Sequence, residues 1–119
     1  FDASGPTTYS LTQSFAVGLI PLLNATLAWS DAATWSITGA DRVFSVDILN
    51  GATVLQNFYT LNANGVGSYT WTGRSFDVTS LLNANLGNTL TLRFQVSIPE
   101  TWTGPAGLGV DAVSLDGET

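Results

Sequence analysis

A single carboxylate stands inside an apolar run near the end of the chain. The stretch "GLGVDAVSLDG", residues 107–117, places Asp111 between Val110 and Ala112. Moving an ionised carboxylate out of water costs on the order of several kcal/mol, so Asp111 must be paired, bound to a metal ion or solvated. Its simplest structural role is to accept backbone N–H groups at a bulge or to pair with an arginine.

Aromatic rings in loops are the second feature that could do chemistry. Sugars present apolar C–H faces that stack on such rings, while amides, carboxylates and arginines bind the hydroxyl groups. Trp102 lies in the loop "PETWTGPAG" (99–107), and with Glu100 beside it is our main candidate for a ligand contact; its alternative role is a lid over the core. Trp35, which follows a loop-like stretch, and Tyr59, which we expect to point outward, are further ligand-binding candidates.

Arg93 stands on the polar face of the alternating run "TLTLRFQVSI" (89–98). If the two strands are close, Asp47 can reach it, and such a cross-strand ion pair contributes roughly 0.2–1 kcal/mol. A sugar-binding arginine on a concave sheet face is the alternative, which keeps Arg93 among the ligand-binding candidates.

Composition narrows the function further. The chain of 119 residues has a formal net charge of −6, with three arginines, no lysine and no histidine. Because phosphate binding needs clustered cations, this balance argues against a nucleic-acid partner, and likewise against an anionic membrane surface. Without histidine, cysteine or lysine the usual nucleophile–base pairs cannot form, and no pair of carboxylates stands out for glycoside hydrolysis, so we expect no enzyme.

Membrane insertion is not expected either. The segment 15–29 is apolar, but Pro21 and Asn24 interrupt it, and it is shorter than the ~20 residues of a spanning helix. The chain has no cysteine and therefore no disulfide. Only 10% of its residues are charged, and Ser, Thr, Asn and Gly are abundant, as is typical of bacterial extracellular domains. We therefore predict a secreted bacterial protein, extracellular or at the cell surface.

Apolar residues alternate with polar ones along most of the chain, and helical periodicity is almost absent. The clearest alternation is in 42–49 and 89–98, and "NG" at 50–51 predicts a tight type I′ hairpin turn after the first of these runs. The whole pattern predicts eight or nine short strands. Trp29 and Trp71 alternate within strands, so we expect both in the core.

Strands with one apolar face must bury it against another sheet. We therefore predict one domain, residues 1–119, with an all-β fold: an antiparallel two-sheet β-sandwich, a jelly roll of about eight strands. A closed up-and-down barrel is the alternative. One helical turn is expected within 77–87, with Asp77 or Thr79 as its N-cap.

In the last strand, apolar residues are expected on both faces of the sheet. Leu108 and Val110 share one side of an extended strand, while Val113 and Leu115 share the other. A β-bulge near Asp111 reconciles the two pairs, since one extra residue reverses the facing. A strand covered on both faces is the alternative.

The string "GLGVDAVSL" (107–115) resembles the closing strand of galactose-binding-domain-like jelly rolls, which include many bacterial carbohydrate-binding modules and domains of secreted bacterial proteins with a PEP-CTERM sorting tail. "SLTQSFAV" (10–17) resembles the early strand of these domains, and "RVFSVDILNGATVL" (42–55) resembles their central hairpin. "RSFDVTSLL" (74–82) followed by "LTLRFQV" (90–96) resembles the passage that comes after it. The Asn-Gly-x-Phe-Glu strand with which many such modules begin is missing, unless "FDASG" is its remainder.

In that family the Asp of the closing strand often ligates a structural calcium ion, so the resemblance implies Ca²⁺ at Asp111. Calcium takes six to eight oxygen ligands, and loop carbonyls can supply part of them. The acidic partner has no clear match in this chain; Asp2 is the metal ligand that we carry forward, and Asp31 is a looser candidate.

The resemblance implies a secreted, non-catalytic carbohydrate-binding module whose partner is a polysaccharide or another glycan. The alternative, from a different class, is a self-assembling fibre, surface-layer or biofilm-matrix subunit. Low charge removes the repulsion that keeps sheet edges apart, and residues 1–8 could act as an extended arm that pairs with a neighbour's open edge. This alternative predicts a homo-oligomer or filament.

Overall fold

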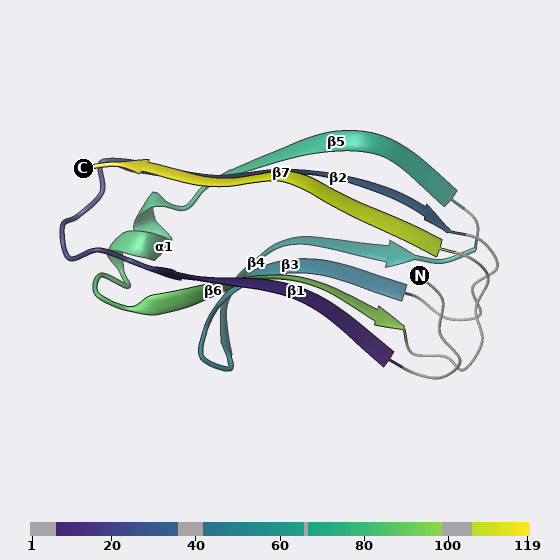
Figure 1. The fold of residues 1–119 in the computed structure, drawn as a ribbon, viewed down its shortest axis with the longest axis horizontal. Helices are drawn as coiled ribbons and strands as arrows, with labels where there is room; N and C mark the ends of the chain where they lie inside the picture. Colours follow the sequence, from purple (N-terminus) through teal and green to yellow (C-terminus); the bar gives the residue numbers. More distant parts are fainter. Residues whose placement is uncertain (1–6, 36–41, 66, 99–105) are drawn as a thin grey trace.

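Two antiparallel sheets face each other across an apolar interior, as predicted (Figure 1). The computed structural model describes residues 7–35, 42–65, 67–98 and 106–119. Within these ranges the sheets hold seven strands, against the eight or so of the predicted jelly roll. The elements in chain order are β1 (Thr7–Ala16), β2 (Asn24–Trp35), β3 (Arg42–Asn50), β4 (Thr53–Ala63), β5 (Gly67–Asp77), α1 (Thr79–Asn83), β6 (Thr89–Ile98) and β7 (Ala106–Glu118).

The four-stranded sheet has the order β1-β6-β3-β4, and the three-stranded sheet has the order β5-β2-β7. Among the described strands, β3 and β4 are the only consecutive pair that is hydrogen-bonded; the other connections cross between the sheets. An up-and-down barrel pairs each strand with the next one along the chain, so that alternative is wrong. The sheet edges are formed by β1, β4, β5 and β7.

The interior follows the alternation along the sequence. In β6 every second side chain from Leu90 to Ile98 is buried. Trp29 of the three-stranded sheet stacks on Phe76, with 5.4 Å between ring centroids, and meets Phe94 of the other sheet edge-on at 5.6 Å. Because burying a large apolar side chain contributes about 1.5–3 kcal/mol, this aromatic cluster holds the two sheets together.

A β-bulge interrupts β7 and confirms one interpretation of the parity conflict. The register against β2 shifts so that Trp29 opposes two residues of β7, Ala112 and Val113. Ala112 has a φ of 54°, in the left-handed region. The extra residue lets apolar side chains on both sides of the bulge turn toward the core. Those packed against the core are Leu108, Val110 and Leu115. Val113, which is part of the bulge, is 46% exposed, so only one member of the second pair reaches the core.

The hairpin between β3 and β4 differs from the predicted type I′ turn. Asn50 pairs with Thr53, so the two loop residues are Gly51 and Ala52. Positive φ is found at Gly51, at 60°, and not at Asn50 or Ala52. This pattern matches a type II′ turn, which places glycine at its first central position.

The predicted helical turn is α1, and its N-cap residue is Val78, which has no side-chain cap. Asp77 still organises this end, because its Oδ1 accepts hydrogen bonds from Thr79 N–H at 2.9 Å and from Thr79 Oγ1 at 2.6 Å. These two bonds favour the charged carboxylate and lower the pKa of Asp77. No helix in the described ranges is long and apolar enough to cross a membrane.

Candidate functional site

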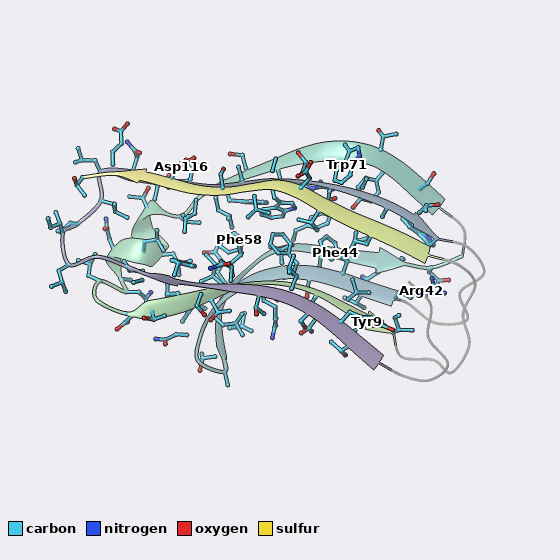
Figure 2. All side chains as sticks on the ribbon, viewed as in Figure 1. Tyr9, Arg42, Phe44, Phe58, Trp71 and Asp116 are labelled. Carbon is cyan, nitrogen blue, oxygen red and sulfur yellow. The ribbon has the colours of Figure 1, made fainter. Side chains whose placement is uncertain are left out.

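The outer face of the three-stranded sheet carries the most exposed aromatic residue in the described part of the chain. Trp71 of β5 is 58% exposed. Figure 2 shows it on the upper sheet, whereas Phe44 and Phe58 lie between the sheets. The expectation that Trp71 belongs to the core is therefore wrong, while Trp29, expected there as well, is buried.

A bulge in β5 turns Trp71 outward. The register against β2 shifts so that two residues, Thr70 and Trp71, oppose the single residue Ala32. One extra residue reverses the facing of a strand. Tyr69 consequently points to the interior, where its hydroxyl donates to Asp31, whereas Trp71, two residues later, lies on the outer face.

The indole of Trp71 reaches across β2 to β7. A Cβ atom placed on Gly109 would lie 2.8 Å from Cη2 and 3.2 Å from Cζ2 of the ring. Gly109 thus leaves free the space that the ring occupies, and Ala32, on the strand between, is too small to lift the ring away. The ring is held against the sheet while more than half of the residue stays exposed.

Residues with hydroxyl groups lie beside this ring. Thr34, Ser68 and Thr70 are exposed, and together with Trp71 they line a shallow depression of about 560 Å³. None of its described lining residues carries a charge. An aromatic surface ringed by hydroxyl groups can stack on the apolar face of a sugar and exchange hydrogen bonds with its hydroxyls. We name this surface the Trp71 face; it consists of Ala32, Thr34, Ser68, Thr70, Trp71, Gly107 and Gly109.

A buried carboxylate lies on the inner face of the same sheet. Asp31 is fully buried and accepts hydrogen bonds from Trp29 Nε1 at 2.7 Å, from the Tyr69 hydroxyl, and from Nε and Nη2 of Arg74 at 3.1 Å each. Arg74 Nη2 also donates to the Tyr59 hydroxyl at 3.0 Å. Because a buried charge is costly unless it is fully paired, this network fixes side chains of β2, β4 and β5 in one arrangement.

The contacts of Asp31 favour the ionised form of its carboxyl group. Burial alone would raise the pKa of Asp31, but hydrogen bonds from Arg74, Tyr69 and Trp29 and the positive charge of Arg74 outweigh it and hold the pKa below its usual value. Burial and the bond to Asp31 raise the pKa of Tyr69 well above its usual range. At neutral pH the network therefore holds one carboxylate, one guanidinium and a neutral phenol, an arrangement suited to a structural role.

Two sequence candidates, Trp35 and Tyr59, lie on the core-facing sides of their sheets and do not line the Trp71 face. Trp35 is half-buried, and its indole N–H donates to the carbonyl of Asn64 at 3.2 Å. Tyr59 was expected to point outward, but its ring lies 4.0 Å from the guanidinium carbon of Arg74. The reason is a bulge in β4: Phe58 is the extra residue in the register, so Phe58 and Tyr59 both turn inward.

Arg93 forms the predicted cross-strand ion pair. It lies opposite Asp47 in the pairing of β3 with β6, with 3.1 Å between Nη2 and Oδ2. Asp47 also accepts a hydrogen bond from Asn57 Nδ2 at 2.8 Å. Trp102, Glu100 and Asp2 lie outside the described residues, and their roles stay predictions.

Asp111 is exposed, and its Oδ1 accepts the N–H of Ala112 at 2.8 Å within the bulge. Asp31 is directed to the other face of the sheet and is saturated by its own donors, so the two carboxylates cannot share an ion. In the part of the chain that the structure describes, no group of three or more His, Cys, Asp or Glu side chains could hold a metal ion. Calcium bound by Asp111 and Asp2 therefore stays a prediction.

Sequence reasoning missed Trp71, although the sequence contains a signal for it. Tyr69 and Trp71 share one parity, whereas Arg74 and Phe76 share the other. Tyr69 and Arg74 can both face the core only if an extra residue lies somewhere between them, so the sequence indicates a bulge within 69–74. The position of that residue depends on the pairing with β2, and only the structure shows that it leaves Trp71 outside.

Comparison with known proteins finds no matching family model and no matching curated protein. The likeness to galactose-binding-domain-like jelly rolls stays a resemblance of sequence motifs. The functional argument therefore depends on the residues of this chain.

Proposed function

We propose that the protein is a non-catalytic glycan-binding domain and that the Trp71 face is its binding surface. The observation that carries the proposal is the exposed ring of Trp71, which the β5 bulge holds on a face of small and hydroxyl-bearing residues. A buried position would be the ordinary place for tryptophan in a sandwich of this size. An exposed one beside hydroxyl groups supports a role in stacking against a sugar.

The chemistry of the surface favours a neutral glycan. The lining residues of the Trp71 face carry no charge, and the whole chain has a net charge of −6. An anionic polysaccharide would be repelled by this field, whereas a neutral one offers apolar faces and hydroxyl groups without an electrostatic penalty. We include in the proposal the expected location, secreted or at the cell surface, where such polysaccharides are met.

The test is isothermal titration calorimetry with soluble oligosaccharides derived from cellulose, laminarin, starch, mannan and xylan. Trp71→Ala should raise the Kd of any oligosaccharide that the wild type binds about tenfold or more, since a lost stacking contact of about 1.4 kcal/mol corresponds to a factor of ten. Trp71→Phe should retain part of the affinity, because a smaller ring still stacks.

Val54→Ala is the matched control, because Val54 is an exposed apolar residue on the other sheet and its removal should leave the Kd unchanged. Trp102→Ala tests the loop tryptophan favoured by the sequence. Binding that survives Trp71→Ala, or that is lost only in Trp102→Ala, would place the site elsewhere. No binding to any of the five oligosaccharide classes would reject a neutral glycan as the ligand.

The alternative of a fibre, surface-layer or matrix subunit stays a prediction. It depends on residues 1–8 as a strand-exchange arm, and most of these lie outside the described residues.

A further inference from the structure

One side of the sandwich is open. β1 ends the four-stranded sheet and β7 ends the three-stranded sheet (Figure 1). Side chains of both strands line a groove between these two edges. The two parts of the groove have volumes of about 380 and 230 Å³. Leu11 of β1 is 63% exposed there and Val113 of β7 is 46% exposed. The other apolar residues that line the groove include Phe15, Leu92, Phe94, Val96, Val110 and Leu115.

The opposite side of the sandwich is bridged. There the edge strands are β4 and β5, and Arg74 of β5 donates to the hydroxyl of Tyr59 of β4 at 3.0 Å. The guanidinium also lies over the ring of Tyr59. Among the described residues, this contrast identifies the β1 side as the one where apolar side chains such as Leu11 and Val113 are most exposed.

Of the four edge strands, β1 is the one with an unbroken register. Its ten residues pair one for one with β6. Register shifts interrupt the other three edges, β4, β5 and β7. β1 also contains no charged residue, no proline and no glycine. Native edges are normally protected from pairing by charges, prolines or bulges, and β1 has none of these devices.

The charge distribution favours β1 over β7 as a contact between copies. β7 carries the exposed carboxylates Asp111, Asp116 and Glu118. The chain has a net charge of −6, and like charges placed opposite each other across strands are destabilising. β1 brings hydroxyl, amide and apolar side chains to a contact, so two copies can meet there without facing carboxylates.

We propose that two copies of this chain pair antiparallel along β1, which joins their four-stranded sheets into one sheet of eight strands. A two-fold axis at Thr12 makes the strand self-complementary. Tyr9 then lies opposite Phe15 and Ser10 lies opposite Ser14, and pairs of aromatic or hydroxyl residues are favourable across strands.

The dimer covers part of the open groove. Leu11 and Gln13 then face each other across the new strand pair, on the groove side of the sheet. A two-fold contact uses the same edge in both copies, so the assembly closes at two and does not extend into a fibre. The contact is independent of the Trp71 face, which lies on the other sheet.

The first test is sedimentation velocity from micromolar to near-millimolar concentration. The wild type should approach twice the mass of one chain. Leu11→Lys should remain a monomer at all concentrations, because it brings two like charges into the interface. Val54→Lys also replaces an exposed apolar residue by lysine, at the β4 edge of the same sheet, and it should dimerise like the wild type. Circular dichroism checks that both variants fold. A monomeric wild type, or a dimer that survives Leu11→Lys, would overturn the proposal.

A second test gives a positive signal. Since the chain has no cysteine, Thr12→Cys adds a single thiol. Directly opposed residues in an antiparallel pair have Cα atoms about 4.5–5.5 Å apart, which is within the range of a disulfide. Mild oxidation should link Thr12→Cys into a covalent dimer and leave Gln56→Cys, exposed on β4, largely unlinked. Equal linking of the two variants, or filaments in negative stain, would contradict a closed pair at β1.

Discussion

Asp31 and Trp71 lie on opposite faces of the three-stranded sheet, and each is kept in place by its neighbours. Asp31 is buried as an anion because Trp29, Tyr69 and Arg74 supply all the donors that its oxygens need. Trp71 is accommodated because Gly109 leaves room for its ring. The inner network packs on the core side of the sheet, and it fixes β5, the strand that presents Trp71.

The free energy of unfolding should fall as the pH drops below about 4. The folded pKa of Asp31 lies below its unfolded value, so the unfolded state takes up the proton more readily. The stabilisation is fully present above the unfolded pKa and is lost as the pH falls through the folded pKa. Asp77, whose pKa is lowered too, acts in the same direction. Urea unfolding from neutral to strongly acidic pH measures this dependence.

Asp31→Asn should flatten part of that pH dependence. At neutral pH the same change should lower the free energy of unfolding by about 3 kcal/mol, because it leaves the charge of Arg74 unpaired. This value is the lower end of the range for buried ion pairs, since the Arg74 side chain is 21% exposed. Asp77→Asn is the control for the exposed carboxylate. If the free energy of unfolding of Asp31→Asn depended on pH as strongly as that of the wild type, Asp31 would not be the cause of the pH dependence.

At the scale of residues, the partner of a side chain was easier to predict from the sequence than the side of the sheet on which it lies. The Arg93–Asp47 ion pair followed from two polar positions in alternating strands. The role of Asp111 at a bulge followed from the parity conflict around it. Trp71 and Tyr59 were placed on the wrong side, because the facing of each depends on a bulge set by the neighbouring strand.

At the scale of elements, bulges decide which residues reach solvent and which reach the core. In β5 the extra residue leaves Trp71 outside, and in β7 it turns Val110 and Leu115 inside together. Strand positions were predictable because apolar alternation is a local property: 89–98 was predicted and is the strand β6. The pairing order was not, since it depends on contacts between distant parts of the chain.

Deleting Ala112 should destabilise the protein by about 3 kcal/mol or more. Without the extra residue, either Val110 and its neighbour Leu108 or Leu115 must turn away from the core. Ala112→Gly keeps the bulge and accepts the positive φ, so its stability should stay within about 1 kcal/mol of the wild type. Thermal and urea unfolding compare the two variants, and a deletion with a wild-type Tm would mean that β7 does not need the bulge.

At the scale of the whole molecule, the two sheets divide the surface into parts with different properties. The three-stranded sheet presents the Trp71 face, while the four-stranded sheet ends in the regular edge β1. The sandwich itself was predicted from composition and alternation, because strands with one apolar face have few ways to bury it. The groove between β1 and β7 was not predictable, since it depends on which strands end the two sheets in the described part of the chain.

The central claim, that Trp71 contacts a glycan, is tested most directly by NMR of the tryptophan indole N–H groups. The indole N–H of Trp29 donates to the buried Asp31 and that of Trp35 donates to the carbonyl of Asn64, whereas the ring of Trp71 is exposed. Titration with the tightest oligosaccharide from calorimetry should shift the Trp71 resonance saturably and leave those of Trp29 and Trp35 in place. Saturation of the protein with glycan while the Trp71 resonance stays unmoved would contradict the account.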